Sequence, residues 1–175
     1  RDPVAKSYFF DQDGVPLITG TLLKNPEYTA TLRDLATNGT ANFYNGTIAK
    51  DIVAKVRDAH WNPGVLSLQD MANYRVKERA PVCVDYREYD VCGMGPPSSG
   101  ALTVGQILGL LEPYDLAALG PQSPDSWRLI GDASRLAFAD RGRYMADSDF
   151  LPVPVAGLLD KTYLAERSKL LAGET

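Results

Sequence analysis

The chain has few of the residues on which many enzymes and membrane proteins depend. Its 175 residues include one histidine, His60, and two cysteines, Cys83 and Cys92. A zinc site built from several histidines is therefore excluded, and a Ser-His-Asp triad would have to use His60. No apolar run approaches the roughly 20 residues that a membrane-spanning helix needs. We expect no metal ion, no cofactor and no membrane partner.

Positive charge is also scarce. The chain has 18 lysines and arginines against 22 aspartates and glutamates, which gives a net charge of −4. No basic run is dense enough to follow a phosphate backbone, so nucleic acid is not an expected partner. Apolar residues make up 45% of the chain, a globular composition. The length predicts one domain or part of a larger one.

Helices are predicted from capping residues and apolar periodicity. They are expected at 26–38, 47–59, 68–74, 101–111, 126–147 and 160–173. In the longest of these, Trp127, Ile130, Ala133, Ala137 and Tyr144 form one apolar stripe. We place His60 at the end of the second helix, against the negative end of its dipole. The spacing of Gly105 and Gly109 indicates that another backbone approaches the helix at 101–111.

Two hairpins are expected. One joins residues 8–10 to 15–18 through Asp13-Gly14, and the other lies within residues 75–94, where apolar residues alternate. If Arg87-Glu88 form a two-residue turn in the second hairpin, Cys83 lies opposite Cys92 at a separation that a disulfide accepts. The turn pair is unfavourable, however, and Asp85 would face Asp90. Two separate thiols are therefore the default expectation, with a disulfide as the alternative.

A loop rich in proline and serine precedes the helix at 101–111. It contains Pro96, Pro97, Ser98, Ser99 and Gly100. Such a loop can bind an anion at a helix N-terminus, hold a nucleophilic serine or only shape the backbone. It matches neither phosphate-binding glycine motif nor the G-x-S-x-G motif of serine hydrolases. We therefore expect a structural loop in which Ser99 caps the helix.

Two groups of charged residues lie in and just after the C-terminal part of the longest predicted helix. Asp147 and Asp149 could act as an acid and a base or bind a metal, but a polar turn favours solvated carboxylates. Asp140 with Arg141 and Arg143 is more simply explained by structural ion pairs. Neither group is expected to be catalytic.

Four motifs in a fixed order resemble a known family. They read NPEYTATLRDLATNGTANFYNGTIAKDIV, SLQDMANYRVKERAPV, PPSSG before QILGLLE, and DASRLAFADRGRYMADSDFLPVPV. Together they resemble the gamma-glutamyltranspeptidases and the related cephalosporin acylases. The resemblance covers nearly the whole chain and corresponds to the latter part of the family's large subunit. One departure is Ala101, which stands where the family usually has a second glycine.

The resemblance implies a helix-rich α+β segment of an αββα N-terminal-nucleophile hydrolase. The family is made as a precursor that cleaves itself, and its nucleophile is the threonine that begins the small subunit. Residues 1–175 would then be the C-terminal portion of the large subunit, with no catalytic residue, unknown substrate-binding residues and the small subunit as partner. The loop at 96–100 would be scaffold near the substrate cleft. Family members are periplasmic or secreted, and a cytoplasmic location stays open.

Three functions remain open from the sequence. The intact protein could attack gamma-glutamyl amides such as glutathione and pass the acyl group to water or an amino acid. It could instead be an acylase with other amide substrates. The region could also act alone as a noncatalytic structural or binding domain.

Overall fold

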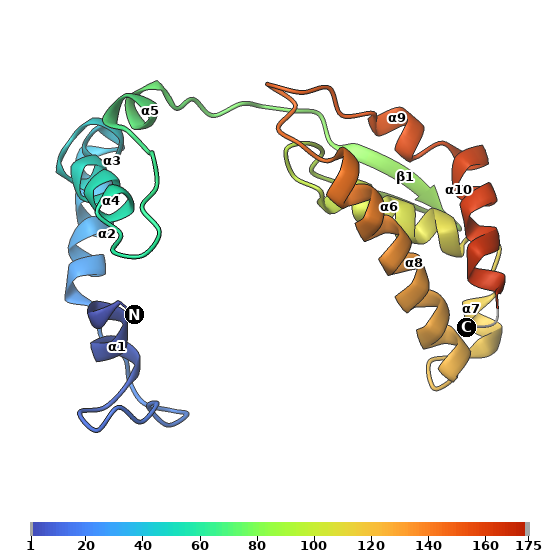
Figure 1. The fold of residues 1–175 in the computed structure, drawn as a ribbon, viewed down its shortest axis with the longest axis horizontal. Helices are drawn as coiled ribbons and strands as arrows, with labels where there is room; N and C mark the ends of the chain where they lie inside the picture. The colour runs from blue at the N-terminus through green and yellow to red at the C-terminus, as the bar shows by residue number, and fades with distance from the viewer. Residues whose placement is uncertain (1, 174–175) are drawn as a thin grey trace. The chain divides into compact units, whose positions relative to one another are not determined.

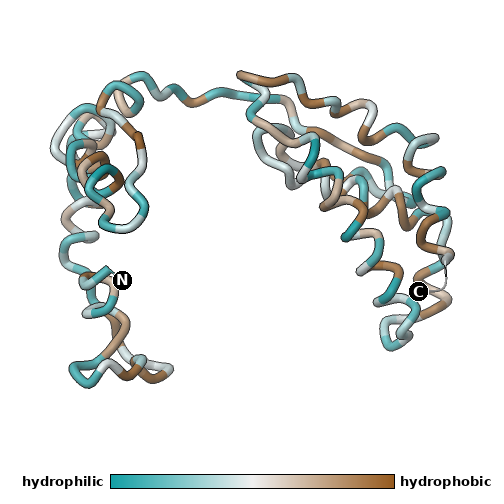
Figure 2. Tube along the Cα trace, viewed as in Figure 1, coloured by the Kyte–Doolittle hydropathy of each residue, from teal (hydrophilic) through white to brown (hydrophobic). Residues whose placement is uncertain are grey.

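The computed structural model describes residues 2–173. The chain divides into two compact units, Arg1–Val76 and Lys77–Thr175 (Figure 1). The segment that connects them, residues 75–80, is largely hydrophilic (Figure 2). Among residues 2–173, no helix combines the length and the apolar character that crossing a bilayer requires.

The first unit consists of helices with little buried surface. Its elements are α1 (Pro3–Phe9), α2 (Pro26–Asn38), α3 (Ala41–Asn45), α4 (Thr47–Arg57) and α5 (Leu68–Asn73). Two of the N-caps expected from the sequence are confirmed: the Asn25 side chain accepts a hydrogen bond from the Tyr28 amide, and Ser67 forms a capping box with Asp70. Ser123, which was expected to cap the longest helix, makes no side-chain cap hydrogen bond. Of the described residues of the first unit, only Ala49 and Val53 are buried apolar side chains. This unit therefore has little core of its own.

The hairpin expected near the N-terminus is wrong. Asp2 accepts hydrogen bonds from the amides of Val4 and Ala5, and Pro3 occupies the first turn, so the first apolar run completes α1. Only an isolated bridge between Phe10 and Pro16 remains of the pairing. The Asp13-Gly14 turn does form, with the Gly14 amide donating to the Asp11 carbonyl, but the Asp2 cap makes most of the first apolar run helical, so no strand forms there.

Two further details of this unit differ from expectation. The helix α3 was not predicted, because its five residues are too few to show a period. The helix α4 ends at Arg57, so His60 lies beyond the last turn and not against the helix end.

The second unit contains a hairpin and a group of helices. Its elements are β1 (Val82–Tyr86), β2 (Tyr89–Gly93), α6 (Gly100–Leu111), α7 (Leu116–Leu119), α8 (Pro124–Tyr144), α9 (Val155–Leu158), α10 (Lys161–Ser168) and a 3₁₀ turn (Lys169–Ala172). Helix α6 contacts both strands, α8 and α10 (Figure 1). The core comprises Leu110, Leu111, Leu129, Ala133, Leu164 and Leu171. The helix-rich α+β class is confirmed.

Close packing around α6 depends on its two glycines. A Cβ at Gly105 would lie 2.9 Å from Val84 Cγ1 and 3.0 Å from Leu159 Cδ2. A Cβ at Gly109 would lie 2.6 Å from Leu164 Cδ1. The glycines do permit a close approach, but the groups that approach are side chains of β1 and the C-terminal helices, not a backbone.

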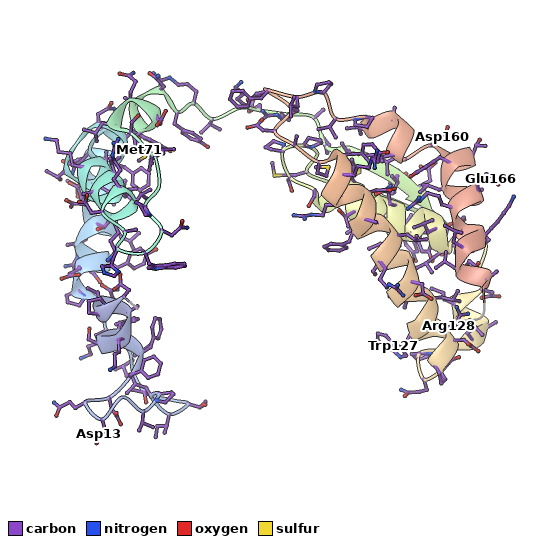
Figure 3. The ribbon with its side chains drawn as sticks, in the orientation of Figure 1. Asp13, Met71, Trp127, Arg128, Asp160 and Glu166 are labelled. Atoms are coloured by element: carbon purple, nitrogen blue, oxygen red, sulfur yellow. A yellow bond between two sulfur atoms is a disulfide. The ribbon has the colours of Figure 1, made fainter. Side chains whose placement is uncertain are left out.

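The apolar stripe of α8 is only partly buried. Ala133 and Ala137 are fully buried, and Ile130 packs against the core. Trp127 is 64% exposed and donates its Nε1 hydrogen to the Pro121 carbonyl, so it lies away from the core (Figure 3). Tyr144 is also exposed. The expected stripe is therefore wrong at its two aromatic ends.

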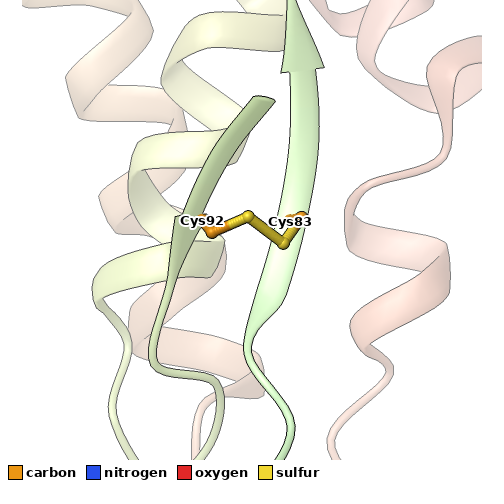
Figure 4. The surroundings of a disulfide bond; sticks show 2 residues. All are labelled: Cys83 and Cys92. Atoms are coloured by element: carbon orange, nitrogen blue, oxygen red, sulfur yellow. A yellow bond between two sulfur atoms is a disulfide. The ribbon is translucent and has the colours of Figure 1, made fainter. Parts of the chain in front are cut away.

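The hairpin has the expected register, with Tyr86 opposite Tyr89 and Cys83 opposite Cys92. The default expectation of two separate thiols is wrong, because Cys83 and Cys92 form a disulfide across the strands (Figure 4). The unfavourable turn pair is accommodated because Arg87 adopts φ 58° and donates to the Tyr114 carbonyl at 2.7 Å.

Candidate functional site

The loop at 96–100 connects β2 to α6 and is well packed. Gly95 and Pro96 are buried, whereas Ser98 and Ser99 are half-buried. The Ser98 amide donates to the Gly95 carbonyl at 3.0 Å, and the peptide bond between Pro96 and Pro97 is cis. The hydrogen bond from Ser98 to Gly95 closes a turn directly before the helix.

The expected cap by Ser99 is wrong in its mechanism. Ser99 occupies the N-cap position of α6, but its backbone is helical and its side chain makes no cap hydrogen bond. An effective N-cap residue is normally extended, so that its oxygen reaches back to the first-turn amides. The Ser99 hydroxyl instead accepts a hydrogen bond from Arg141 Nε at 2.8 Å.

A second contact holds the same loop. Ser148 donates its hydroxyl hydrogen to the Pro96 carbonyl at 3.3 Å. Ser148 follows α8, and Arg141 lies in its last turn. The structure thus brings together the PPSSG motif and the RGRYMADS stretch, which are more than 40 residues apart. Sequence reasoning treated these two motifs separately.

This arrangement does not activate a serine. Activation requires a base within hydrogen-bond reach of the hydroxyl, and an arginine guanidinium keeps its proton at any pH at which proteins fold. The only histidine, His60, belongs to the other unit. The contacts support a structural role for Ser98 and Ser99.

Replacing Ser98 and Ser99 together with alanine is expected to lower the free energy of unfolding by about 1 kcal/mol, the scale of one or two exposed hydrogen bonds. Turnover by the intact protein should stay largely intact. Urea unfolding and a turnover assay would measure the two effects. Loss of several orders of magnitude in turnover, with folding unchanged, would instead place these serines in the chemistry.

The most buried charged group of the described chain is Asp140 of α8, at 6% exposure. Its carboxylate accepts hydrogen bonds from Gln106 Nε2 at 2.9 Å and from the Tyr163 hydroxyl at 2.7 Å. Arg167 Nη2 lies 3.2 Å from the other carboxylate oxygen. The group joins α6, α8 and α10. We refer to Gln106, Asp140, Tyr163 and Arg167 as the three-helix polar cluster.

The structural ion pair expected at Asp140 is confirmed, but its partner is different. Arg141 contacts Ser99, and Arg167 pairs with Asp140. The neighbours in sequence point elsewhere because successive helical residues are about 100° apart around the axis. No local signal identified Gln106, Tyr163 or Arg167 as partners.

The polar cluster also affects Tyr163. Burial, followed by its hydrogen bond to Asp140, raises the pKa of Tyr163 from 10.0 to about 12. Between these values the unfolded chain binds fewer protons than the native one, so stability falls with rising pH. We expect this contribution to be fully present below pH 10 and to be lost as the pH rises through about 12. The free energy of unfolding of Tyr163→Phe, measured in urea, should change less with pH between pH 10 and about 12 than that of the parent. An equal change in both proteins would contradict the assignment.

The two carboxylates after α8 do not form an acid and base pair. Asp149 lies 2.8 Å from Lys77 Nζ and 2.9 Å from Arg79 Nη2, and its hydrogen bond to Lys77 is the main cause that lowers its pKa. Asp147 Oδ1 accepts the Asp149 amide hydrogen. Within residues 2–173, no group of three or more His, Cys, Asp or Glu side chains could hold a metal ion.

Open grooves flank the hairpin of the second unit. One, of about 620 Å³, is lined by Cys83, Asp85, Lys161 and Ala165 together with the glycines of α6. The other, of about 290 Å³, is lined by residues 92–95 and 79–81. Cys83 and Cys92 therefore face different grooves.

Comparison with known proteins explains the order of the motifs. The Gamma-glutamyltranspeptidase family model matches residues 1–175. A glutathione hydrolase proenzyme of Escherichia coli is 38% identical over 88% of this chain and 26% of its own length. The Acylase ACY 1 proenzyme of Pseudomonas strain V22 is 38% identical over 92% of this chain and 28% of its own length.

The fold agrees with these sequence matches. The crystal structure of Helicobacter pylori gamma-glutamyltranspeptidase matches with a TM-score of 0.80 at 35% identity, over 99% of this chain and 49% of that chain. The chain spans only about a quarter of the length of the two curated relatives. The expected placement of this segment in an N-terminal-nucleophile hydrolase fold is confirmed. The chain belongs to the gamma-glutamyltranspeptidase family.

Proposed function

We propose that the intact protein transfers or hydrolyses gamma-glutamyl groups of amides such as glutathione. The observation that carries this proposal is the similarity to a glutathione hydrolase proenzyme over most of this chain. In such a reaction a threonine hydroxyl attacks the gamma-glutamyl carbonyl, while the α-amine of the same residue accepts its proton. The acyl group then passes from the threonine to water or to an amino acid.

We assign residues 1–175 to the C-terminal portion of the large subunit. The strands support a further partner, because β1 pairs only with β2 in the described chain. Cys83 and Asp85 on β1, and Asp90 and Cys92 on β2, occupy alternate positions whose backbone groups face the outer edges. The free edge of β2 favours pairing with further strands, whereas the edge of β1 borders the groove of about 620 Å³. The small subunit of the same precursor is the proposed partner.

The nucleophile is proposed to lie outside this chain. Both cysteines are joined in a disulfide, and the serines of the 96–100 loop contact no base. The loop from Pro96 to Gly100 would contribute scaffold near the substrate cleft. Its role would be to fix the direction in which α6 leaves the sheet.

An acylase is the second candidate function. The specific observation that favours it is the similarity to the Acylase ACY 1 proenzyme, at the same identity as the glutathione hydrolase. The two candidates share the acyl-enzyme chemistry and differ in which acyl group the site accepts. A noncatalytic role for this region alone is the third.

A turnover assay separates the three functions. The 175-residue chain and the intact precursor would each be incubated with a gamma-glutamyl anilide and with an anilide of a non-glutamyl acid. Release of aniline from the gamma-glutamyl substrate by the processed precursor alone is expected. Release only from the other anilide would favour the acylase, and turnover by the 175-residue chain itself would overturn the assignment of the nucleophile.

A further inference from the structure

The Cys83–Cys92 disulfide lies on the solvent side of the hairpin. Along β1, Val82 and Val84 are half-buried against α6, whereas Cys83 and Asp85 are exposed. Cys92 is exposed on β2 in the same way. The disulfide crosses between the two strands, whose outer edges are unpaired in the described chain (Figure 4). Both cysteines of the disulfide are therefore exposed to solvent.

Access to the two sulfur atoms is unequal. In thiol-disulfide exchange the attacking thiolate approaches one sulfur from the side opposite the leaving sulfur. For Cys83 this side is the outer edge of β1, where the groove of about 620 Å³ lies. For Cys92 it is the outer edge of β2, whereas the groove of about 290 Å³ that Cys92 lines lies at the open end of the hairpin, between residues 79–81 and 92–95. The geometry therefore favours attack at Cys83.

Nearby charges do not reverse this preference. Asp85 is close in sequence to Cys83 and is paired with Lys161 Nζ at 3.4 Å. On the other strand, Asp90 occupies the position opposite Asp85 and lies two residues from Cys92. On the Cys83 side, the negative charge of Asp85 is therefore paired with Lys161, which weakens its repulsion of an attacking thiolate.

We propose that the Cys83–Cys92 disulfide is a thiol-exchange site, at which a small thiol such as glutathione attacks Cys83 through the larger groove. The thiolate sulfur bonds to Cys83 Sγ, the bond between the two cysteines breaks, and Cys92 leaves as a thiolate. A second thiol molecule then attacks the mixed disulfide, and Cys83 leaves as a thiolate. The net change is one protein disulfide and two thiols converted into a protein dithiol and one small-molecule disulfide.

Exchange would loosen the hairpin. The like charges of Asp85 and Asp90 face each other directly beside the disulfide and disfavour strand pairing once that bond is broken. The contacts that remain include the strand ladder, the packing of α6 on both strands, the ion pair of Asp85 with Lys161 and the bond from Arg87 to the Tyr114 carbonyl. The hairpin would thus respond to the concentration of free thiols, and this response does not depend on the proposed catalytic function.

The site of exchange can be read by peptide mass. The intact protein, with the disulfide oxidised, would be treated briefly with millimolar reduced glutathione, alkylated and digested with trypsin. Cleavage at Arg79, Arg87 and Arg128 separates Cys83 from Cys92. The expected result is glutathione on the Cys83 peptide and the alkyl group on the Cys92 peptide, in several-fold excess over the reverse.

A pair of variants tests the role of the groove. Ala165 lines the larger groove, so Ala165→Leu should slow formation of the Cys83 adduct by about threefold or more, because exchange depends on access. The matched control is Ala156→Leu, an exposed alanine of α9 outside that groove, which should leave the rate unchanged. Equal rates in both variants would overturn the entry route.

Three other outcomes would overturn the proposal. Alkylation of both cysteines in untreated protein would show that the disulfide is absent. If the disulfide stays intact at thiol concentrations that reduce a small linear disulfide, it is inaccessible. Adducts found mainly on the Cys92 peptide would show that attack comes from the other strand edge.

Discussion

Asp140→Ala is expected to lower the free energy of unfolding of the second unit by about 3–5 kcal/mol, the usual result of removing one partner of a buried ion pair. Arg167 would lose its carboxylate, and Gln106 and Tyr163 would lose a common acceptor. Because Asp140 is only 6% exposed, water cannot readily replace that acceptor. The three helices that meet at the polar cluster would lose this shared polar contact and keep only their apolar packing.

The measurement is urea unfolding followed by tryptophan fluorescence in a Trp61→Phe background. Trp61 belongs to the first unit and is 84% exposed, so that Trp127 alone would then report on the second. Asp132→Ala is the matched control on the same helix, since the half-buried Asp132 pairs with two exposed arginines, Arg128 and Arg135. The control should cost less than about 1 kcal/mol. Equal losses of free energy of unfolding from the two substitutions would show that the buried cluster stabilises the unit no more than the ion pairs of Asp132 do.

Replacing both cysteines with serine is expected to lower the free energy of unfolding by about 2.5 kcal/mol. Cys83 and Cys92 are nine residues apart, and closing a loop of this size removes conformational entropy from the unfolded chain. The opposition of Asp85 and Asp90 would add to the loss, since the disulfide no longer holds these strands together.

Reduction of the parent protein provides the control. The parent with a phosphine reductant should unfold at the same urea concentration as the double variant, and the oxidised parent at a higher one. If the reductant leaves the parent unchanged while the double variant is destabilised, the loss would come from the serine side chains and not from the disulfide. The same comparison shows how strongly thiol exchange would affect the hairpin.

Local chemistry in the sequence correctly predicted several elements. Asn25-Pro26 begins α2, Ser67 with Asp70 begins α5, and alternation across residues 82–93 gives the paired strands with their register. These helix starts and this strand pairing depend on residues within a few positions of one another, so the local sequence is sufficient to predict them. The first hairpin is only partly formed: the turn at Asp13-Gly14 is present, but the Asp2 cap makes Tyr8 and Phe9 part of a helix and not of a strand.

The sequence by itself determined the helix-rich α+β class, the positions of six of the ten described α-helices, the hairpin register and, through four ordered motifs, the family. Only the tertiary structure decided that Arg141 holds Ser99, that Arg167 pairs with Asp140 and that Asp149 pairs with Lys77 and Arg79. Each of these contacts joins residues from about 25 to 70 positions apart in the chain. Which polar groups meet depends on how the helices pack and rotate against one another, and this is set by the whole buried core, not by any local pattern.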